Sequence, residues 1–165
     1  MRLFVAVWPS EDVLASIAAF ARPEVAGLRW TTPDQWHVTL RFLGECEVDD
    51  ATAALSSMSA PATEAVMGPV TGRFGQRILQ VPVAGLDEVA HAAVDASRDV
   101  GQAPEDRPFK GHLTLARSRR GDSDLRPLAG TPLAGRWSVT EVTLVASQLH
   151  PHGARYETVA TVALT

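Results

Sequence analysis

Two patterns of apolar residues alternate along the chain: short continuous or alternating runs, and longer stretches with apolar residues every three or four positions. The first pattern is typical of strands, and the second of helices with one apolar face. The apolar runs predict strands over 2–8, 28–32, 36–43, 65–74, 77–83, 112–116, 137–149 and 156–164. The helical spacing predicts helices over about 10–22, 48–58 and 86–100.

Turn and capping residues mark the ends of several of these elements. Ser10 precedes two acidic residues and is expected to cap the first helix, which Pro23 ends. Gly75-Gln76 separates two apolar runs and predicts a hairpin. The segment Arg117–Gly135 is rich in Gly, Arg, Asp and Pro, and it predicts a long loop.

One short pattern occurs twice. The runs WHVTLRFL at Trp36 and GHLTLAR at Gly111 share the sequence His-X-Thr-Leu, and their histidines lie 75 residues apart. Each copy falls on a predicted strand, and helices accompany both. No linker rich in Gly, Ser or Pro divides the chain. We therefore expect one domain over residues 1–165, built as two related α+β lobes packed face to face.

Strand geometry places the polar residues of each motif together. Side chains alternate between the two faces of a strand, so His37 and Thr39 share one face while Val38 points into the core. His112 and Thr114 repeat this arrangement. If the two lobes are related by an approximate two-fold axis, both pairs face one cleft. Two imidazoles then suit a general base and a general acid near neutral pH, and the hydroxyls suit phosphate oxygens.

Other catalytic patterns are missing from the sequence. There is no His-Glu-X-X-His zinc motif, no Gly-X-Ser-X-Gly elbow and no phosphate-binding glycine loop. Cys46 is the only cysteine, which excludes disulfides and zinc fingers, and its acidic neighbours disfavour a nucleophilic role. A single His-X-Thr on a strand carries little information, but two copies indicate acid–base catalysis with no metal and no other cofactor.

Composition adds limits rather than a function. The 165 residues are 45% hydrophobic and 21% charged, which is ordinary for one globular domain. The net charge of −4 disfavours a large sequence-independent surface for duplex nucleic acid. The apolar run at 2–8 is too short for a signal peptide, Pro9 stops it, and no run is long enough to span a membrane, so a cytoplasmic protein is expected.

Taken together, these segments resemble the RNA 2′,3′-cyclic phosphodiesterase family, also called 2′-5′ RNA ligase-like, of the 2H phosphoesterase superfamily. The resemblance covers nearly the whole chain. It rests on four runs of residues, RLFVAVWP, RWTTPDQWHVTLRFLGE, FKGHLTLAR and PHGARYETVATVAL. One departure is Gly111, where the family usually has proline before the second histidine; glycine would loosen the start of that strand.

The resemblance implies a bilobal α+β fold with antiparallel sheets lining a central cleft and helices outside. It also implies a hydrolase that opens an RNA 2′,3′-cyclic phosphate and leaves a 2′-phosphate, as in RNA processing. In that reaction His112 would activate water and His37 would protonate the departing 3′-oxygen, although the sequence alone leaves the two roles interchangeable. Thr39 and Thr114 would bind the phosphate.

Four further residues are candidates with different support. Arg117 matches a family cation and is expected to contact phosphate, Phe42 matches an aromatic position that stacks on the terminal base, and Tyr156 matches a tyrosine of the last strand. Strict alternation turns Phe42 and Arg117 away from the histidines unless a bulge intervenes. The same alternation puts Arg41 on the histidine face, where it would approach phosphate or pair with an acid.

Two other functions remain open at this point. The substrate could be a small cyclic nucleotide metabolite, which the net charge suits equally well. The chain could also be an RNA-end-binding module without catalysis, although binding alone does not need two titratable groups. RNA ends are the expected partner, with no membrane, no obligatory protein partner and a monomeric state. The unperturbed imidazoles predict maximal activity between about pH 6 and 8.

Overall fold

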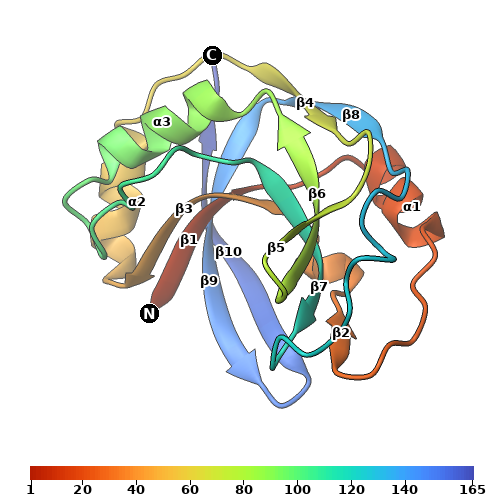
Figure 1. The fold of residues 1–165 in the computed structure, drawn as a ribbon. Helices are drawn as coiled ribbons and strands as arrows, with labels where there is room; N and C mark the ends of the chain where they lie inside the picture. The colour runs from red at the N-terminus through yellow and green to blue at the C-terminus, as the bar shows by residue number, and fades with distance from the viewer.

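The strands of the computed structural model, which describes residues 1–165, form a strongly curled antiparallel sheet (Figure 1). The main path runs in the order β10-β9-β1-β3-β7-β6-β4-β8, with β2 attached to β7 and β5 to β6. The strands are β1 (Arg2–Val7), β2 (Leu28–Trp30), β3 (Val38–Glu45), β4 (Thr63–Met67), β5 (Gly72–Phe74), β6 (Ile78–Ala84), β7 (His112–Ser118), β8 (Gly135–Val139), β9 (Glu141–His150) and β10 (Gly153–Ala163).

The sheet divides into two halves that meet at one point. Strands β10, β9, β1 and β3 form the first lobe, and β2 with β4 to β8 forms the second. The only cross-strand pair between β3 and β7 is Val38 with Leu113. Each lobe carries one His-X-Thr motif at this junction. The bilobal α+β architecture with antiparallel strands is therefore confirmed.

Three helices cover the sheet: α1 (Glu11–Ala19), α2 (Val48–Ser56) and α3 (Asp87–Ala96). Helix α3 packs on β3 of the opposite lobe, α1 packs on β8 of the opposite lobe, and α2 lies beside α3 and β10. The exchange links the lobes, because each of the two helices follows a strand of one lobe and covers the other. None of the three helices has the length and apolar character that crossing a bilayer requires.

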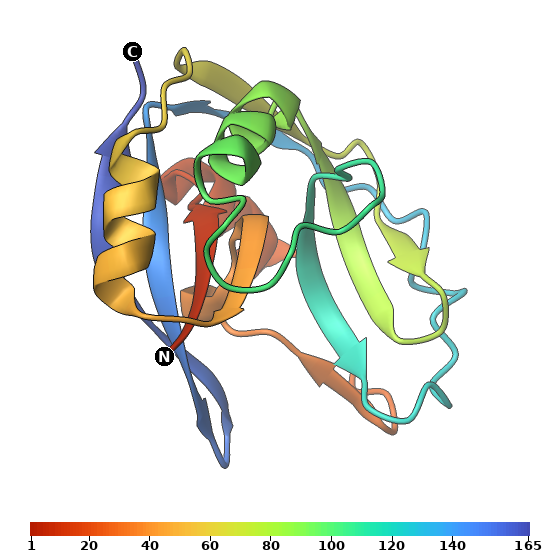
Figure 2. The ribbon, with the colours of Figure 1, turned by 90° about the vertical axis from the view of Figure 1, so that its left-hand side faces the viewer.

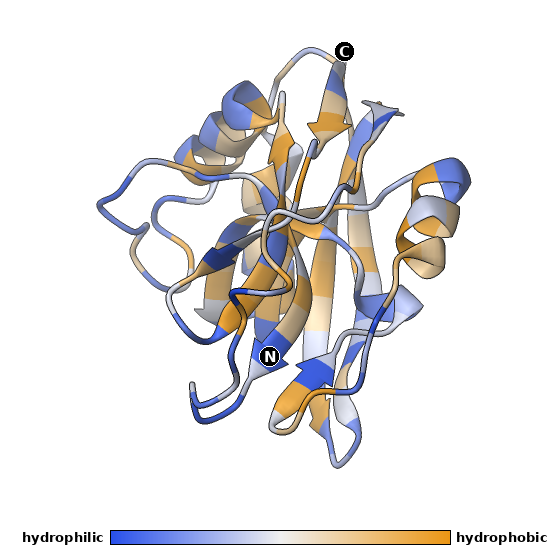
Figure 3. Cartoon of the chain, turned by 45° about the vertical axis from the view of Figure 1, so that its right-hand side comes forward, coloured by the Kyte–Doolittle hydropathy of each residue, from blue (hydrophilic) through white to orange (hydrophobic).

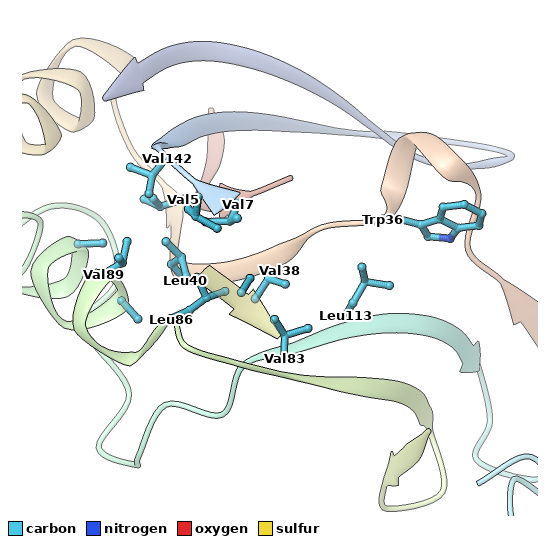
Figure 4. Packing of buried hydrophobic residues seen from close by; sticks show 14 of the residues in the cluster. Val5, Val7, Trp36, Val38, Leu40, Val83, Leu86, Val89, Leu113 and Val142 are labelled. Atoms are coloured by element: carbon cyan, nitrogen blue, oxygen red, sulfur yellow. The ribbon is translucent and has the colours of Figure 1, made fainter. Parts of the chain in front are cut away.

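One cluster of 31 buried residues forms the core and draws on both lobes. Val38, Leu40 and Leu113 point into it together with Leu86 and Val89 from the α3 region (Figure 4). Polar residues gather on the outer sides of the helices and in the loops, while apolar residues follow the strands (Figure 3). Burial of the X position of each motif leaves the histidines and threonines on the other side of the sheet.

Two predicted strands are each divided in the structure. The run 65–74 breaks after Met67, because Gly68 takes a φ of 102° and packs so closely that a Cβ would lie 2.3 Å from the carbonyl oxygen of Leu133. The run 137–149 breaks at the polar residue Thr140, and its parts join different lobes as β8 and β9. The β5–β6 hairpin around Gly75 is confirmed.

The helices end earlier than the apolar pattern predicts. Helix α1 ends at Ala19 rather than near residue 22, and α3 ends at Ala96 rather than 100. At the end of α3 the hydroxyl of Ser97 donates to the carbonyl oxygen of Ala93. The guanidinium of Arg41 donates to the carbonyl oxygen of Ser97. Ser10 precedes α1 as expected, but its side chain makes no capping hydrogen bond.

Candidate active site

A cleft of about 440 Å³ lies on the side of the sheet away from the core, and residues of both lobes line it. The β9–β10 hairpin stands on one side of this region and the ends of β2 and β7 on the other (Figure 2). Both histidines and both threonines of the repeated motifs line the cleft, as predicted. Phe42, Arg117 and Tyr156 line it as well.

The junction of the two lobes brings the motifs together. Because β3 and β7 are antiparallel and pair at Val38 and Leu113, the flanking positions are also opposed. His37 therefore lies next to Thr114, and Thr39 next to His112. The motifs are related by an approximate two-fold axis through the Val38–Leu113 pair, which is the arrangement that the duplicated pattern predicts.

Backbone carbonyls fix the tautomer of both histidines in the same way. The Nδ1 atom of His37 lies 2.7 Å from the carbonyl oxygen of Gln35, and Nδ1 of His112 lies 2.7 Å from that of Lys110. A carbonyl oxygen can only accept, so Nδ1 carries the hydrogen in each ring. Nε2 is then the nitrogen that exchanges a proton. The Nε2 atom of His37 lies 3.1 Å from the Thr39 hydroxyl oxygen.

Aromatic rings enclose the two histidines to different degrees. The ring of His37 stacks on Phe4 at 5.0 Å, meets Trp8 at 5.2 Å and is met edge-on by Tyr156 at 5.2 Å and 87°. His112 has one such neighbour, Phe74, edge-on at 4.8 Å and 83°. Both histidines thus have a perpendicular aromatic neighbour, but only His37 is boxed in on several sides.

This difference in enclosure appears in the pKa values. Burial lowers the pKa of His37 to about 4, with smaller contributions from the charges of Arg117 and His112, while the bond to Gln35 acts in the opposite direction. Burial also lowers the pKa of His112, again assisted by Arg117 and Arg107. Both rings are therefore predominantly neutral at pH 7 before substrate binds. Nε2 of His112 has a free lone pair, whereas Nε2 of His37 accepts the hydrogen of the Thr39 hydroxyl.

Matching bulges follow the two motifs. In β3 the pairing with β1 passes from Thr39 to Arg41, and in β7 the pairing with β6 passes from Thr114 to Ala116. The extra residue in each strand, Leu40 or Leu115, reverses the side-chain alternation after it. Phe42 and Arg117 consequently turn into the cleft. This is the orientation that the resemblance implies, whereas strict alternation would turn both side chains away from the histidines.

The bulge also overturns the expectation for Arg41, which does not line the cleft. Its side chain is buried at 5% exposure, on the core side of β3. The guanidinium donates to the carbonyl oxygens of Phe42, Ser97, Val100 and Gln102 and to the hydroxyl of Ser97. Arg41 therefore binds neither phosphate nor an acid; it holds the segment that follows α3 against β3.

Two further arginines line the cleft that the sequence did not single out. Arg29 pairs across strands with Arg117, and the guanidinium of Arg2 lies over the ring of Phe42 at 5.1 Å. Arg2, Arg29 and Arg117 form no ion pair, and no Asp or Glu lines the cleft. A chain with a net charge of −4 thus presents a cationic cleft, which favours an anionic ligand.

Gly111, the departure from the family pattern, has a steric role. A Cβ at this position would lie 2.2 Å from the carbonyl oxygen of Val83, and the amide of Val83 donates to the carbonyl oxygen of Gly111 at 2.9 Å. The lack of a side chain at Gly111 therefore lets β6 approach closely just before His112.

The remaining candidates carry no additional chemistry. Burial raises the pKa of the Cys46 thiol, with further contributions from Glu45, Asp50 and Glu47. Nowhere in the molecule do three His, Cys, Asp or Glu side chains come together as a metal site.

Known proteins similar to this chain include phosphoesterases. The family model described as LigT like Phosphoesterase matches residues 7–67. An RNA 2′,3′-cyclic phosphodiesterase of Thermus thermophilus is 33% identical, with the match covering 94% of this chain and 86% of that protein. A protein of the same name from Geobacillus stearothermophilus is 28% identical over 95% of this chain, which spans only 55% of that relative's length.

Solved structures share the whole fold. The crystal structure of TT0787 from Thermus thermophilus superposes with a TM-score of 0.83 at 25% identity, covering 99% of this chain and 97% of that one. Escherichia coli LigT in complex with 3′-AMP gives a TM-score of 0.76 at 25% identity, covering 99% and 98% of the two chains.

Proposed function

Because the chain belongs to the LigT-like phosphoesterase family, of the 2H phosphoesterase type, we propose that it hydrolyses RNA 2′,3′-cyclic phosphate ends to 2′-phosphomonoesters by two-histidine acid–base catalysis. The observation that carries the proposal is the paired placement of His37 and His112. Each ring donates its Nδ1 hydrogen to a backbone carbonyl and keeps Nε2 for proton exchange, in one cationic cleft.

The reaction needs two proton transfers at one phosphorus atom. A water oxygen attacks phosphorus while one Nε2 takes a proton from that water, and the bond from phosphorus to O3′ breaks. The second Nε2 gives its proton to O3′, which becomes the 3′-hydroxyl, and the phosphate stays on O2′. Each turnover leaves one imidazole with an extra proton and the other without it, and exchange with solvent restores the starting state.

The resemblance makes His112 the base and His37 the acid. His112 is neutral in the empty cleft and ready to accept a proton, since its pKa lies below the ordinary value. His37 must gain a proton as substrate binds, because its pKa is about 4 in the empty cleft. The negative charge of the bound phosphate raises that pKa, which couples substrate binding to the charging of the acid.

The other lining residues hold the anion. The Thr114 hydroxyl makes no hydrogen bond within the protein and can donate to a non-bridging phosphate oxygen. The Thr39 hydroxyl donates to Nε2 of the neutral His37, and its hydrogen becomes available to phosphate once His37 is protonated. Arg117 and Arg29 lie together on paired strands and supply positive charge. Phe42, which is 38% exposed, offers a face for the terminal base.

A small cyclic nucleotide is the second candidate substrate, and the cleft volume favours it. About 440 Å³ lies toward the lower end of the range for small-molecule sites. Escherichia coli LigT has also been crystallised with 3′-AMP, with NADP+ and with ATP. A cytoplasmic location, a monomeric state and independence of any obligatory protein partner remain part of the proposal.

The decisive experiment is mass spectrometry of an oligonucleotide that ends in a 2′,3′-cyclic phosphate, incubated with the protein in EDTA. The proposal expects the addition of one water and a phosphate on the 2′-oxygen. Activity that appears only with a divalent metal would contradict the mechanism. Tight RNA binding with no conversion over hours would instead support an RNA-end-binding module.

A further inference from the structure

A cluster of three arginines lies beyond the cleft, at the open end of the second lobe, and the proposed reaction does not use it. We call Arg77, Arg119 and Arg120 the arginine rim. Resting on the proposed function, we propose that the arginine rim binds the backbone phosphates of the RNA strand that precedes the cyclic end, so that the substrate is an oligonucleotide rather than a cyclic mononucleotide.

The arginine rim continues directly from the cleft. Ile78, the residue after Arg77, pairs across strands with Arg117, which itself pairs on its other side with Arg29. Arg119 and Arg120 follow Arg117 by two and three positions along the chain. Strands β2 and β7 thus carry paired cations at the cleft, and Arg77 lies just before β6 at the edge of the same lobe, where an RNA strand that leaves the cleft would pass.

Backbone contacts hold the arginine rim together. The guanidinium of Arg77 donates to the carbonyl oxygen of Arg119 at 2.6 Å, and the amide of Ser118 donates to the carbonyl oxygen of Arg77 at 2.8 Å. The three side chains are exposed. This anchoring fixes the turn after β7 next to the turn before β6 and keeps the charges close to one another.

No carboxylate neutralises these arginines. The five ion pairs of the molecule involve other cations, and Asp124, on the same loop as Arg120, is paired with Arg126. Asp122 lies against Gly27 and makes no ion pair. In a chain with a net charge of −4, a group of unpaired arginines beside a cationic cleft is a local feature, and a row of phosphates is the ligand that it matches.

The opposite wall offers fewer cations. The tip of the β9–β10 hairpin carries Leu149, which is 81% exposed, followed by His150, Pro151 and His152. These four side chains carry no permanent charge, and the one arginine of the hairpin is Arg155, on β10. The second lobe therefore carries more positive charge than the hairpin, which favours a path for the RNA strand over the second lobe.

The test compares two substrates with the same terminal nucleotide, a 2′,3′-cyclic mononucleotide and a pentanucleotide ending in a 2′,3′-cyclic phosphate. Arg119→Gln with Arg120→Gln should raise KM for the pentanucleotide and leave the mononucleotide unchanged. The slope of log KM against log salt should become shallower by about 0.7 for each phosphate that the protein no longer neutralises. Arg119→Glu with Arg120→Glu should raise KM further. The matched control is Arg98→Gln with Arg136→Gln, two exposed arginines that pair with Asp95 and Glu64.

The outcomes separate this inference from the proposed function. Equal effects on both substrates, or no effect on either, would overturn the arginine rim while leaving the hydrolysis intact. If the wild-type protein hydrolyses neither substrate, the proposed function fails; fluorescence anisotropy of the labelled pentanucleotide then tests the rim alone. Loss of binding in the Gln pair but not in the control pair would still support it, and identical binding in all variants would refute it.

Discussion

Phe42 and Arg117 occupy equivalent positions in the two lobes, each five residues after a motif histidine and each turned into the cleft by a bulge. The backbone is therefore duplicated more faithfully than the side chains. One lobe presents an aromatic face at this position and the other a positive charge. A symmetric scaffold thus provides two different contacts, one suited to a base and one to a phosphate.

Replacing either histidine tests the proposed chemistry. His37→Ala and His112→Ala should each lower turnover by at least about 10²-fold, the usual scale for one general acid or base. The double variant should be little worse than either single one, because both groups act in the same step. His91→Ala, on the exposed side of α3, is the matched control and should leave turnover unchanged. Near-normal turnover by a folded His112→Ala protein would refute the site.

The pH dependence of kcat/KM should be bell-shaped and lie on the acid side of neutrality. Its limbs report the free protein, in which the pKa of His37 is about 4 and that of His112 is below 6.5. The optimum is therefore expected between about 4 and 6.5, lower than unperturbed imidazoles predict. For kcat the optimum should move upward, since bound phosphate raises both pKa values. Coincident profiles for kcat and kcat/KM would contradict the coupling of binding to the charging of His37.

The same shift makes stability depend on pH. The pKa of His37 is lower in the folded protein than in the unfolded chain, so between these values the unfolded chain binds more protons. The contribution of the neutral His37 to the free energy of unfolding is fully present above about pH 6.5 and is lost as the pH falls toward 4. Thermal unfolding of the wild type should therefore show a decline in Tm over this range that is smaller in His37→Gln. Equal declines in the two proteins would argue against a buried neutral imidazole.

Arg117→Gln should change both the pKa values of the two histidines and the KM. Arg117 lowers the pKa of both histidines, so its removal should raise both, observable by NMR titration of the imidazole resonances. KM should rise at the same time, because one cation of the cleft is lost. The exposed Arg98, which lies outside the cleft, provides the control as Arg98→Gln. Unchanged imidazole titrations together with unchanged KM would remove Arg117 from the site.

Arg41→Met should affect stability rather than binding. The substitution leaves several carbonyl oxygens around Ser97 and Gln102 without their donor, and each unsatisfied buried group costs about 1–3 kcal/mol. We expect a loss of about 3 kcal/mol in the free energy of unfolding, measured in urea, with KM of the folded protein unchanged. Arg98→Met should stay within about 0.5 kcal/mol of the wild type. A large rise in KM without destabilisation would restore Arg41 as a phosphate ligand.

Gly111→Ala should weaken both the fold and the site. The added methyl group would meet the carbonyl oxygen of Val83 at 2.2 Å, so β6 and the start of β7 must separate. Because the adjacent Lys110 carbonyl orients His112, turnover should fall together with Tm. The measurements are thermal unfolding and kcat for the same preparation. Wild-type values for both would show that the backbone relaxes without cost.

Much of the site could be predicted from the repeated motif alone. Alternation along a strand is a local rule, and it is sufficient to place His37, Thr39, His112 and Thr114 on one face. The duplication likewise predicts the two lobes and their approximate symmetry. These features are predictable because they depend on neighbouring residues within a single strand.

The orientations that the sequence predicts wrongly are those set by pairing between neighbouring strands. A bulge is set by pairing with the adjacent strand, so nothing in TLRF or TLAR reveals that Arg41 turns into the core and Phe42 into the cleft. The sequence does not reveal Arg2 and Arg29 for a related reason. They reach the cleft through the pairing of β1 with β3 and of β2 with β7, and no local motif surrounds them.

The single pairing of Val38 with Leu113 limits how the site can move. Neighbouring strands in a sheet are held about 4.8 Å apart, so the acid and the base stand on two backbones whose separation hydrogen bonding already sets. The pair therefore sets how far apart the two motif backbones lie before any side chain adjusts. What this contact leaves open is the orientation of the side chains that line the cleft.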